Sequence, residues 1–125
     1  MTSAPIVLLV EDEPMVREMI AFELDLAGFQ VLEAASAEDG LRLLTENARI
    51  DLLFTDIRLP GKNGWQLAEE VRGLHPGVPI VYASGYSDLS QPLSHSKFLQ
   101  KPYRPSQVLQ AAADLGIKPP PAATN

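Results

Sequence analysis

The stretch IVLLVEDEP (residues 6–14) contains the features on which the interpretation of the whole sequence depends. Its first five residues are all branched and apolar, which is typical of a strand buried on both faces of a sheet. Three carboxylates follow at once, Glu11, Asp12 and Glu13, and Pro14 then favours the first turn of a helix. Adjacent carboxylates repel one another. The stretch therefore indicates either a solvated helix start or a place where a positive group sits.

The same alternation of apolar strand and amphipathic helix continues along the chain. Further strands are expected at 29–34, 51–55, 78–83 and 97–100, with helices beginning near Pro14, Ser36, Gly64 and Pro105. Helical spacing marks the following residues for the buried helix faces: Val16, Ile20, Leu24, Ala27, Ala37, Leu41, Leu44, Ala48, Leu67, Ala68, Val71, Leu74, Val108, Leu109, Ala112 and Leu115. This alternation predicts an α/β fold, a three-layer sandwich with a five-stranded parallel sheet between helices on both faces.

Length and composition narrow the class of protein. A chain of 125 residues with 46% hydrophobic and 21% charged residues suits one globular domain. The net charge of −6 argues against binding to nucleic acid or to an acidic membrane. The sequence has no cysteine, no signal peptide and no apolar run long enough to span a membrane, so we expect a cytoplasmic protein. The domain is expected over 1–117, with a disordered Pro-rich tail over 118–125.

Polar side chains stand at the carboxyl ends of four expected strands. Glu11 and Asp12 follow the first, Asp56 the third, Ser84 the fourth and Lys101 the fifth. In open parallel sheets ligands bind at this edge. Carboxylates with water suit a hard cation such as Mg²⁺, and a lysine with a hydroxyl would bind the oxygens of a phosphoryl group. A metal would also relieve the repulsion among the acidic residues.

Other interpretations exist for these residues. A nucleotide-binding domain of flavodoxin-like fold needs a loop rich in Gly, Ser or Thr after the first strand, whereas Glu-Asp-Glu-Pro repels phosphate. Taken singly, Glu11 and Glu13 are typical helix-start charges, Asp56 is a typical turn residue and Lys101 a typical surface residue. Their convergence on one edge of the sheet favours the functional interpretation.

Four stretches together resemble the receiver domain, the phosphoacceptor module of bacterial two-component response regulators. They are IVLLVEDEPMVREMI at 6–20, DLLFTDIRLPGKNGWQL at 51–67, PIVYASGY at 79–86 and FLQKPYRP at 98–105. The resemblance covers roughly residues 5–116. It implies a flavodoxin-like sheet with strand order 2-1-3-4-5.

The resemblance also implies a role for each residue of the expected site. Asp56 would take a phosphoryl group from a phosphohistidine. Asp12 and Asp56 would bind Mg²⁺ directly, Glu11 through water, and Arg58 through its backbone carbonyl. Lys101 would pair with Asp56 before the reaction and with a phosphoryl oxygen after it, and the peptide bond that follows it would be cis.

Two further residues would form a switch. Ser84 would hydrogen-bond the phosphoryl group, and Phe98 would pack inward when Ser84 moves. For Phe98 an ordinary core position remains an equal alternative.

Three features depart from the family pattern. Glu11 replaces the commoner Asp, which leaves a metal contact through water possible. The motif YASGY (82–86) is closer to the "FATG-hydrophobic-Tyr" motif of alphaproteobacterial receivers than to the common Thr-Ala form. Only sixteen residues (85–100) separate Ser84 from Lys101, and the polar segment 87–96 contains a proline. The fourth helix is therefore expected to be short or irregular.

We expect a stand-alone receiver, not itself an enzyme, that is phosphorylated by a histidine kinase or a His-phosphotransfer protein. It would signal through contacts with a downstream protein, as a monomer or weak dimer. The alternatives are a phosphorelay carrier or phosphate sink, the receiver of a hybrid kinase, and an adaptor for which phosphorylation is incidental.

Overall fold

The structure, a computed structural model, describes residues 3–47, 49–85 and 93–119. Strands and helices alternate along most of this part of the chain. In order they are β1 (Ile6–Val10), α1 (Pro14–Leu26), β2 (Gln30–Ala34), α2 (Ala37–Glu46), β3 (Leu52–Asp56), α3 (Gly64–Leu74), β4 (Ile80–Ser84), β5 (Ser96–Gln100) and α4 (Pro105–Asp114). The five predicted strands are present, as are the helices predicted to begin near Pro14, Ser36, Gly64 and Pro105, with ends within two residues of those expected.

The five strands form one parallel sheet in the order β2-β1-β3-β4-β5. This is the predicted flavodoxin-like order. The register brings the carboxyl ends of the central strands level with one another, because Val10 pairs with Thr55 and Asp56 pairs with Ala83. The residues that end or follow these strands therefore meet at one edge of the sheet.

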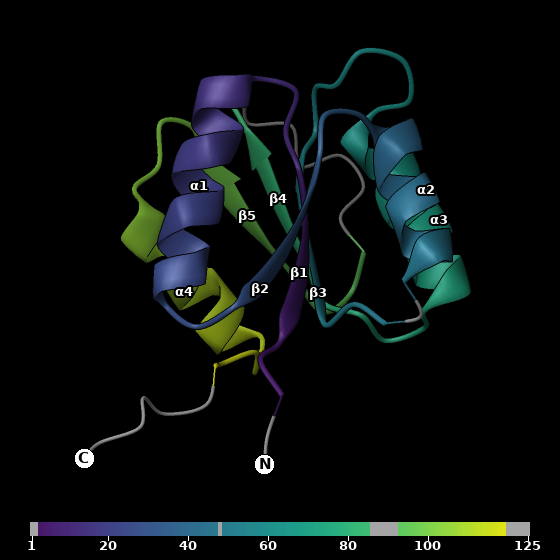
Figure 1. Cartoon of the computed structure of the whole chain (residues 1–125). Helices are drawn as coiled ribbons and strands as arrows, with labels where there is room; N and C mark the ends of the chain where they lie inside the picture. Colours follow the sequence, from purple (N-terminus) through teal and green to yellow (C-terminus); the bar gives the residue numbers. More distant parts are fainter. Residues whose placement is uncertain (1–2, 48, 86–92, 120–125) are drawn as a thin grey trace, which may run out of the picture.

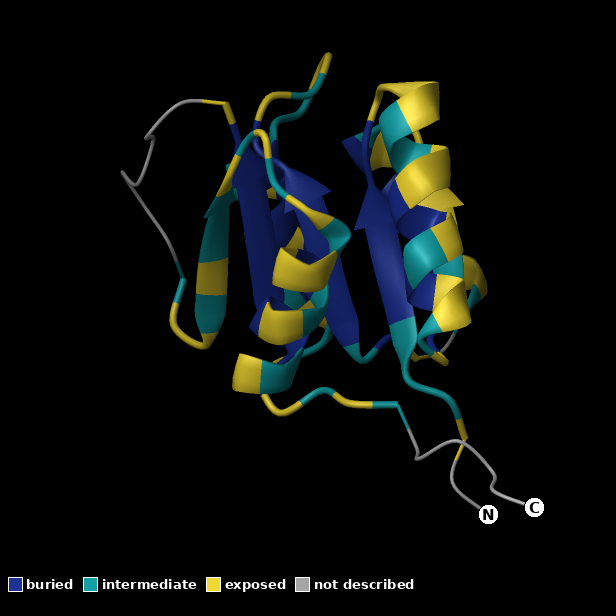
Figure 2. Ribbon diagram, turned by 90° about the vertical axis from the view of Figure 1, so that its left-hand side faces the viewer, coloured by how far each residue is buried: buried dark blue, intermediate teal, exposed yellow. Residues whose placement is uncertain are grey.

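Helices cover both faces of the sheet. Helices α1 and α4 lie on one face, and α2 and α3 lie on the other (Figure 1). The strands β1, β3 and β4 are buried between these layers (Figure 2). Each face has its own apolar core, one that includes Ile20, Leu24 and Val108 and one that includes Leu44 and Leu67. The three-layer prediction is confirmed.

Residues that favour helix starts stand at the N-termini of three helices. Pro14 occupies the first turn of α1. The Ser36 hydroxyl caps α2, because it accepts a hydrogen bond from the Asp39 backbone N–H at 3.0 Å. Asn63 and Gln66 form a full capping box at the start of α3, which the sequence analysis did not identify.

Most of the expected buried positions on the helices do contact the core. Leu74 is an exception: its side chain is 59% exposed, because α3 ends at this residue and the chain turns away through Pro76 and Gly77. The prediction that Leu74 is buried was wrong. Ala48 lies outside the described residues.

No helix is found between β4 and β5 in the residues that are described there, Gly85 and 93–95. The rest of the segment expected to be short or irregular, 86–92, lies outside the described part of the chain. So do residues 120–125 of the expected tail, and its disorder remains a prediction.

Candidate functional site

Three of the expected site residues meet at the carboxyl edge of the sheet. The Nζ atom of Lys101, just after β5, lies 2.7 Å from Oδ2 of Asp56 at the end of β3. The same Nζ lies 3.0 Å from Oε1 of Glu11, which follows β1. The carboxylates of Glu11 and Asp56 are buried, whereas Lys101 remains partly exposed. One ammonium group thus joins two carboxylates that are far apart in the sequence.

The electrostatics of this group follow from burial and pairing. Burial raises the pKa of Glu11, although the Glu13 N–H and the Lys101 ammonium act against this rise. Burial alone would lower the pKa of Lys101, but its hydrogen bonds to Asp56 and Glu11 outweigh that effect and raise it. Lys101 is therefore firmly protonated at neutral pH.

Backbone contacts hold the acidic loop in place. The second carboxylate oxygen of Glu11 accepts a hydrogen bond from the Glu13 N–H at 3.1 Å. The backbone carbonyl of Glu11 accepts a hydrogen bond from Nη1 of Arg17 at 2.9 Å. The backbone N–H of Glu11 donates to the carbonyl of Ala34 at 3.0 Å. Glu11 is consequently fixed from both neighbouring elements, α1 and β2.

The acidic cluster could hold a metal ion. Glu11, Asp12 and Asp56 each offer one carboxylate oxygen, and these oxygens lie within 4.8 Å of one another. Asp12 is exposed, so an ion could approach from its side. Oxygen donors of this kind suit hard divalent cations. The structure places Arg58 two residues after Asp56, with its N–H 3.3 Å from Oδ1 of Asp56; its expected role as a carbonyl ligand stays a prediction.

The two expected switch residues lie on neighbouring strands. Ser84 is buried at the end of β4, and its carbonyl accepts a hydrogen bond from the Lys101 N–H at 2.7 Å. Phe98 is half-buried on β5, where it pairs with Tyr82. Phe98 and Tyr82 line a cleft together with Trp65. The backbone thus links Ser84 directly to the lysine that contacts Asp56.

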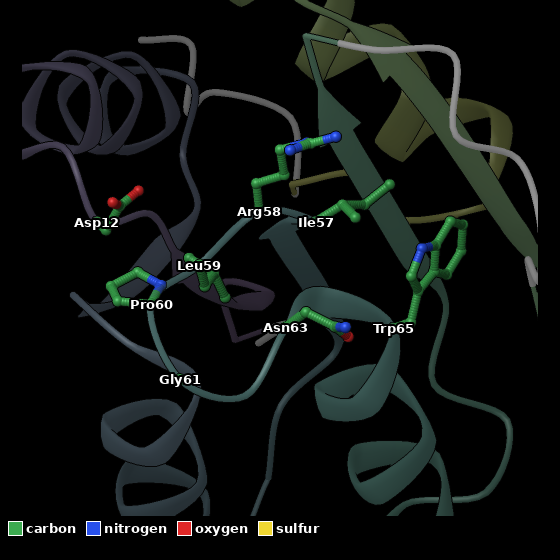
Figure 3. A pocket seen from close by; sticks show the side chains of 8 residues that line it. All are labelled: Asp12, Ile57, Arg58, Leu59, Pro60, Gly61, Asn63 and Trp65. Carbon is green, nitrogen blue, oxygen red and sulfur yellow. The ribbon is translucent and has the colours of Figure 1, made fainter.

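A shallow groove of about 550 Å³ runs from the acidic cluster along the loop after β3. Asp12 and Trp65 lie at its opposite ends, with Arg58 between them (Figure 3). The Trp65 ring stacks at a tilt on Tyr82, with 4.5 Å between the ring centroids. Its buried Nε1 has no hydrogen-bond partner among the described residues.

Sequence reasoning missed the part that Gly64 plays at the site. A Cβ on Gly64 would lie 2.3 Å from the backbone oxygen of Asp56 and 2.8 Å from Cα of Ile57. The Gly64 N–H also donates to the Ile57 carbonyl at 2.8 Å. The start of α3 therefore packs directly on the backbone of Asp56, which only glycine allows. The sequence GKNG (61–64) is typical of a turn, but it does not reveal this close approach.

The sequence analysis also did not identify Tyr103 as a residue near the site. Its hydroxyl is buried without a hydrogen-bond partner among the described residues, and its ring lies edge-on to Phe54 at 5.8 Å. Burial, aided by the nearby charge of Glu11, raises the pKa of Tyr103 to about 12. The sequence around Tyr103, which follows a Lys-Pro pair, does not indicate that its hydroxyl is buried.

The fold and the site together define a flavodoxin-like domain with an acidic cluster and a lysine at the carboxyl edge of its sheet. The profile of the response regulator receiver domain matches residues 7–113, and the chain belongs to this family. The predicted resemblance is therefore confirmed. The Lys101–Pro102 peptide bond is cis, as the resemblance implied.

Individual proteins agree with this assignment. The chain is 30% identical over 117 residues to the C4-dicarboxylate transport transcriptional regulatory protein DctD of Rhizobium meliloti, covering 90% of this chain and 25% of that protein. A response regulator receiver protein from Sinorhizobium medicae is 34% identical with a TM-score of 0.84, covering 90% of this chain and 94% of that one. The chain thus spans about a quarter of DctD and nearly all of the second protein.

Two further solved structures bear on function. The receiver domain of the hybrid histidine kinase CckA is 34% identical with a TM-score of 0.78, covering 88% of this chain and 97% of that domain. The response regulator TrrA from Thermotoga maritima, in complex with Mg²⁺ and BeF, is 26% identical with a TM-score of 0.78, covering 89% of this chain and 98% of that one. Similar domains thus occur in regulators and in kinases.

Proposed function

We propose that this domain accepts a phosphoryl group on Asp56 from the phosphohistidine of a sensor histidine kinase or a His-phosphotransfer protein. The observation that carries the proposal is the contact of Lys101 with the buried carboxylates of Asp56 and Glu11, next to the exposed Asp12. A buried nucleophilic carboxylate beside a fixed ammonium group suits transfer of a group with several anionic oxygens.

In the proposed reaction a carboxylate oxygen of Asp56 attacks phosphorus. The new O–P bond forms as the P–N bond to the donor imidazole breaks, and the imidazole leaves with the electron pair of that bond. Lys101 exchanges its contact with Asp56 for one with a phosphoryl oxygen. The Ser84 hydroxyl donates a hydrogen bond to another phosphoryl oxygen. The domain thus assists its own phosphorylation and dephosphorylation but is not an enzyme acting on other substrates.

We infer that Mg²⁺ is the metal of this site. Asp12 and Asp56 would hold it directly, Glu11 through water and Arg58 through its carbonyl, since all of these are hard oxygen donors. When bound, Mg²⁺ neutralises charge on the phosphoryl oxygens. The likeness to TrrA, whose structure contains Mg²⁺ and BeF, supports this choice of metal.

The output of the domain would be a contact with a downstream protein. The domain would make this contact in the cytoplasm. No helix in the described part of the chain is long and apolar enough to cross a membrane. A kinase that uses ATP as its phosphoryl source would share the same compartment. The net charge of −6 favours a protein partner over nucleic acid.

Incubation with phosphoramidate and Mg²⁺, followed by intact-mass measurement, tests the proposal. The wild type should gain the mass of one phosphoryl group and lose it with hydroxylamine. Asp56→Asn should gain nothing. Asp51→Asn is the matched control, because Asp51 lies at the opposite end of β3 and contacts the Ile6 N–H and Arg49. Mg²⁺-dependent labelling of Asp56→Asn would show that the acceptor assignment is wrong.

A second candidate is a phosphorelay carrier, which the likeness to the receiver of the hybrid kinase CckA supports. A carrier would pass its phosphoryl group on to a His-phosphotransfer protein. Loss of the label from Asp56 with matching gain on such a protein would favour the carrier over the signalling role.

A further inference from the structure

The loop between β3 and α3 carries Arg58 and forms one side of the groove beside the acidic cluster. It is fixed at its two ends: the Arg58 N–H donates to Asp56, and the Gly64 N–H donates to the Ile57 carbonyl. A third contact holds it near its middle, and this contact comes from another element of the fold.

That contact is made by Glu38, in the first turn of α2. Its Oε2 accepts a hydrogen bond from the Lys62 backbone N–H at 3.3 Å. The carboxylate also lies against Gly61, where a Cβ would be only 3.2 Å from Oε2. Gly61 has a left-handed backbone conformation with φ of 75°. A glycine at this position thus lets the carboxylate approach the loop backbone.

Lys62 is held from a second side as well. Its ammonium group forms an ion pair with Glu70 on α3. The backbone of this one residue is therefore bound to α2 and its side chain to α3. Only three residues separate Arg58 from Lys62, and one of them is Pro60, whose ring fixes its φ. Fixing Lys62 consequently restricts where the Arg58 carbonyl can lie.

We propose that Glu38 is a positioning residue for the metal site. Glu38 is not one of the three residues that form the acidic cluster in the described part of the chain, which are Glu11, Asp12 and Asp56. It anchors the loop through which Arg58 would complete the ligand set. This inference rests on the proposed function, because it concerns the same site.

The alternative is that Glu38 only stabilises the N-terminus of α2 by its charge. Asp39 provides the matched control for this effect. It stands in the same turn, carries the same charge and pairs with Arg42 on the surface instead of contacting the loop. Asp39→Asn therefore removes one negative charge from this turn and leaves the loop contact intact.

The test is the Mg²⁺ concentration that gives half of the full thermal stabilisation. Glu38→Ala should raise this concentration about 3- to 10-fold, a smaller effect than loss of a direct partner of a metal ligand. Glu38→Gln keeps an oxygen that can accept from Lys62 and should stay within about twofold of the wild type. Gly61→Ala should resemble Glu38→Ala, since its Cβ would displace the carboxylate. The metal-free melting temperatures of the Glu38 variants should differ little from that of the wild type, because Glu38 is exposed. Gly61→Ala should melt at a lower temperature, because a φ of 75° is strained for alanine.

Fluorescence gives a second measurement that does not depend on phosphorylation. Trp65 is the only tryptophan of the sequence and lines the same groove, so its emission should report Mg²⁺ binding. The half-saturating Mg²⁺ concentrations from fluorescence should rank the variants in the same order as those from thermal stabilisation. Equal half-saturation in Glu38→Ala and Asp39→Asn would overturn the inference, as would a Glu38→Gln variant as weak as Glu38→Ala. A wild type that neither binds Mg²⁺ nor is phosphorylated on Asp56 would instead overturn the proposed function and remove the basis of the inference.

Discussion

The ammonium group of Lys101 contacts Asp56 at 2.7 Å across 45 residues of sequence, and the same group contacts Glu11 at 3.0 Å. From the sequence we expected a metal ion to relieve the repulsion at the acidic cluster. The structure shows that Lys101 also provides part of this relief. Of the three acidic residues, only the exposed Asp12 makes no described contact with Lys101.

Replacing Lys101 by methionine keeps the aliphatic stem and removes the charge. Two buried carboxylates then lose their ionic partner, and a buried charged group left unpaired is destabilising. We expect Lys101→Met to lower the free energy of unfolding by about 1–3 kcal/mol in urea titrations at pH 7 without metal. Mg²⁺ should restore more stability to this variant than to the wild type.

Lys97→Met is the matched control for this variant. Lys97 lies on β5, the strand that Lys101 follows, and its Nζ is 3.9 Å from a carboxylate oxygen of the exposed Asp114. Exposed pairs of this kind contribute less than about 1 kcal/mol. Equal destabilisation by Lys97→Met and Lys101→Met would show that the buried contacts of Lys101 carry no special energy.

Asp12→Asn should weaken the effect of Mg²⁺ on stability. It removes one carboxylate from the cluster of three, so the metal-free melting temperature should rise slightly as repulsion falls. In the wild type, Mg²⁺ at tenfold its dissociation constant should add about 1.4 kcal/mol to the free energy of unfolding. Thermal melts with and without Mg²⁺ measure both effects. Identical Mg²⁺ stabilisation of variant and wild type would remove Asp12 from the ligand set.

The fold was predictable because each strand and helix carries its own local signal. The apolar run before Glu11, the proline at position 14 and the capping Ser36 fix element type and order without reference to distant contacts. The site was predictable because parallel strands must bring their carboxyl ends together. The contact of Lys101 with Glu11 could not be predicted, because it depends on where two side chains lie in space.

Helix α1 shows where periodicity alone is insufficient. Four of its apolar residues form a second, exposed stripe opposite the buried one: Met15, Met19, Phe22 and Leu26. Both stripes have helical spacing, but only one face of a helix can pack on the sheet. The sequence analysis identified the correct stripe and did not notice the other. Leu74 shows the reverse error, because its spacing is correct but its helix ends there.

Gly64→Ala should damage the site, because its Cβ would lie 2.3 Å from the Asp56 backbone oxygen. Either α3 or the Asp56 backbone must move, which should cost about 3 kcal/mol of stability and slow the labelling of Asp56. Gly73→Ala is the matched control in the same helix, since nothing lies within 4 Å of its added Cβ. It should stabilise the protein by about 0.5–1 kcal/mol. Equal effects of the two substitutions in urea unfolding would contradict the close-packing argument.

Tyr103 should make stability fall at alkaline pH. Its pKa of about 12 in the folded protein lies above the ordinary value, so the folded state holds this proton more tightly than the unfolded state does. The resulting contribution is complete below about pH 10 and is lost as the pH rises through about 12. Tyr103→Phe should remove this dependence and leave stability at pH 7 unchanged or higher, because the hydroxyl has no partner among the described residues.

The difference in absorbance between wild type and Tyr103→Phe isolates the titration of this one phenol. It should show a midpoint near pH 12, well above the ordinary value for tyrosine. A midpoint near pH 10 would mean that solvent reaches the hydroxyl of Tyr103 and would contradict this prediction.

The last prediction concerns output. Phosphorylation of Asp56 should move Lys101 and Ser84 together, because the Lys101 N–H is bonded to the Ser84 carbonyl. The strand that leads to Lys101 is β5, an edge strand whose residues, Phe98 included, are at most half-buried. Its rearrangement should therefore require little free energy. We expect the response to concentrate in residues 84–85 and 93–104 within the described part of the chain.

Beryllofluoride with Mg²⁺ mimics the phosphoryl group and makes this measurable by amide hydrogen exchange. Exchange should change most over 93–104 and least over β2, the opposite edge of the sheet, and Asp56→Asn should show no change. The edge strand responds in this view because the bond between Lys101 and Asp56 must be redirected, and Lys101 directly follows β5. A response confined to residues 11–13 and 56–64 would mean that the site fills without altering β5, which would favour the phosphorelay carrier over the signalling domain.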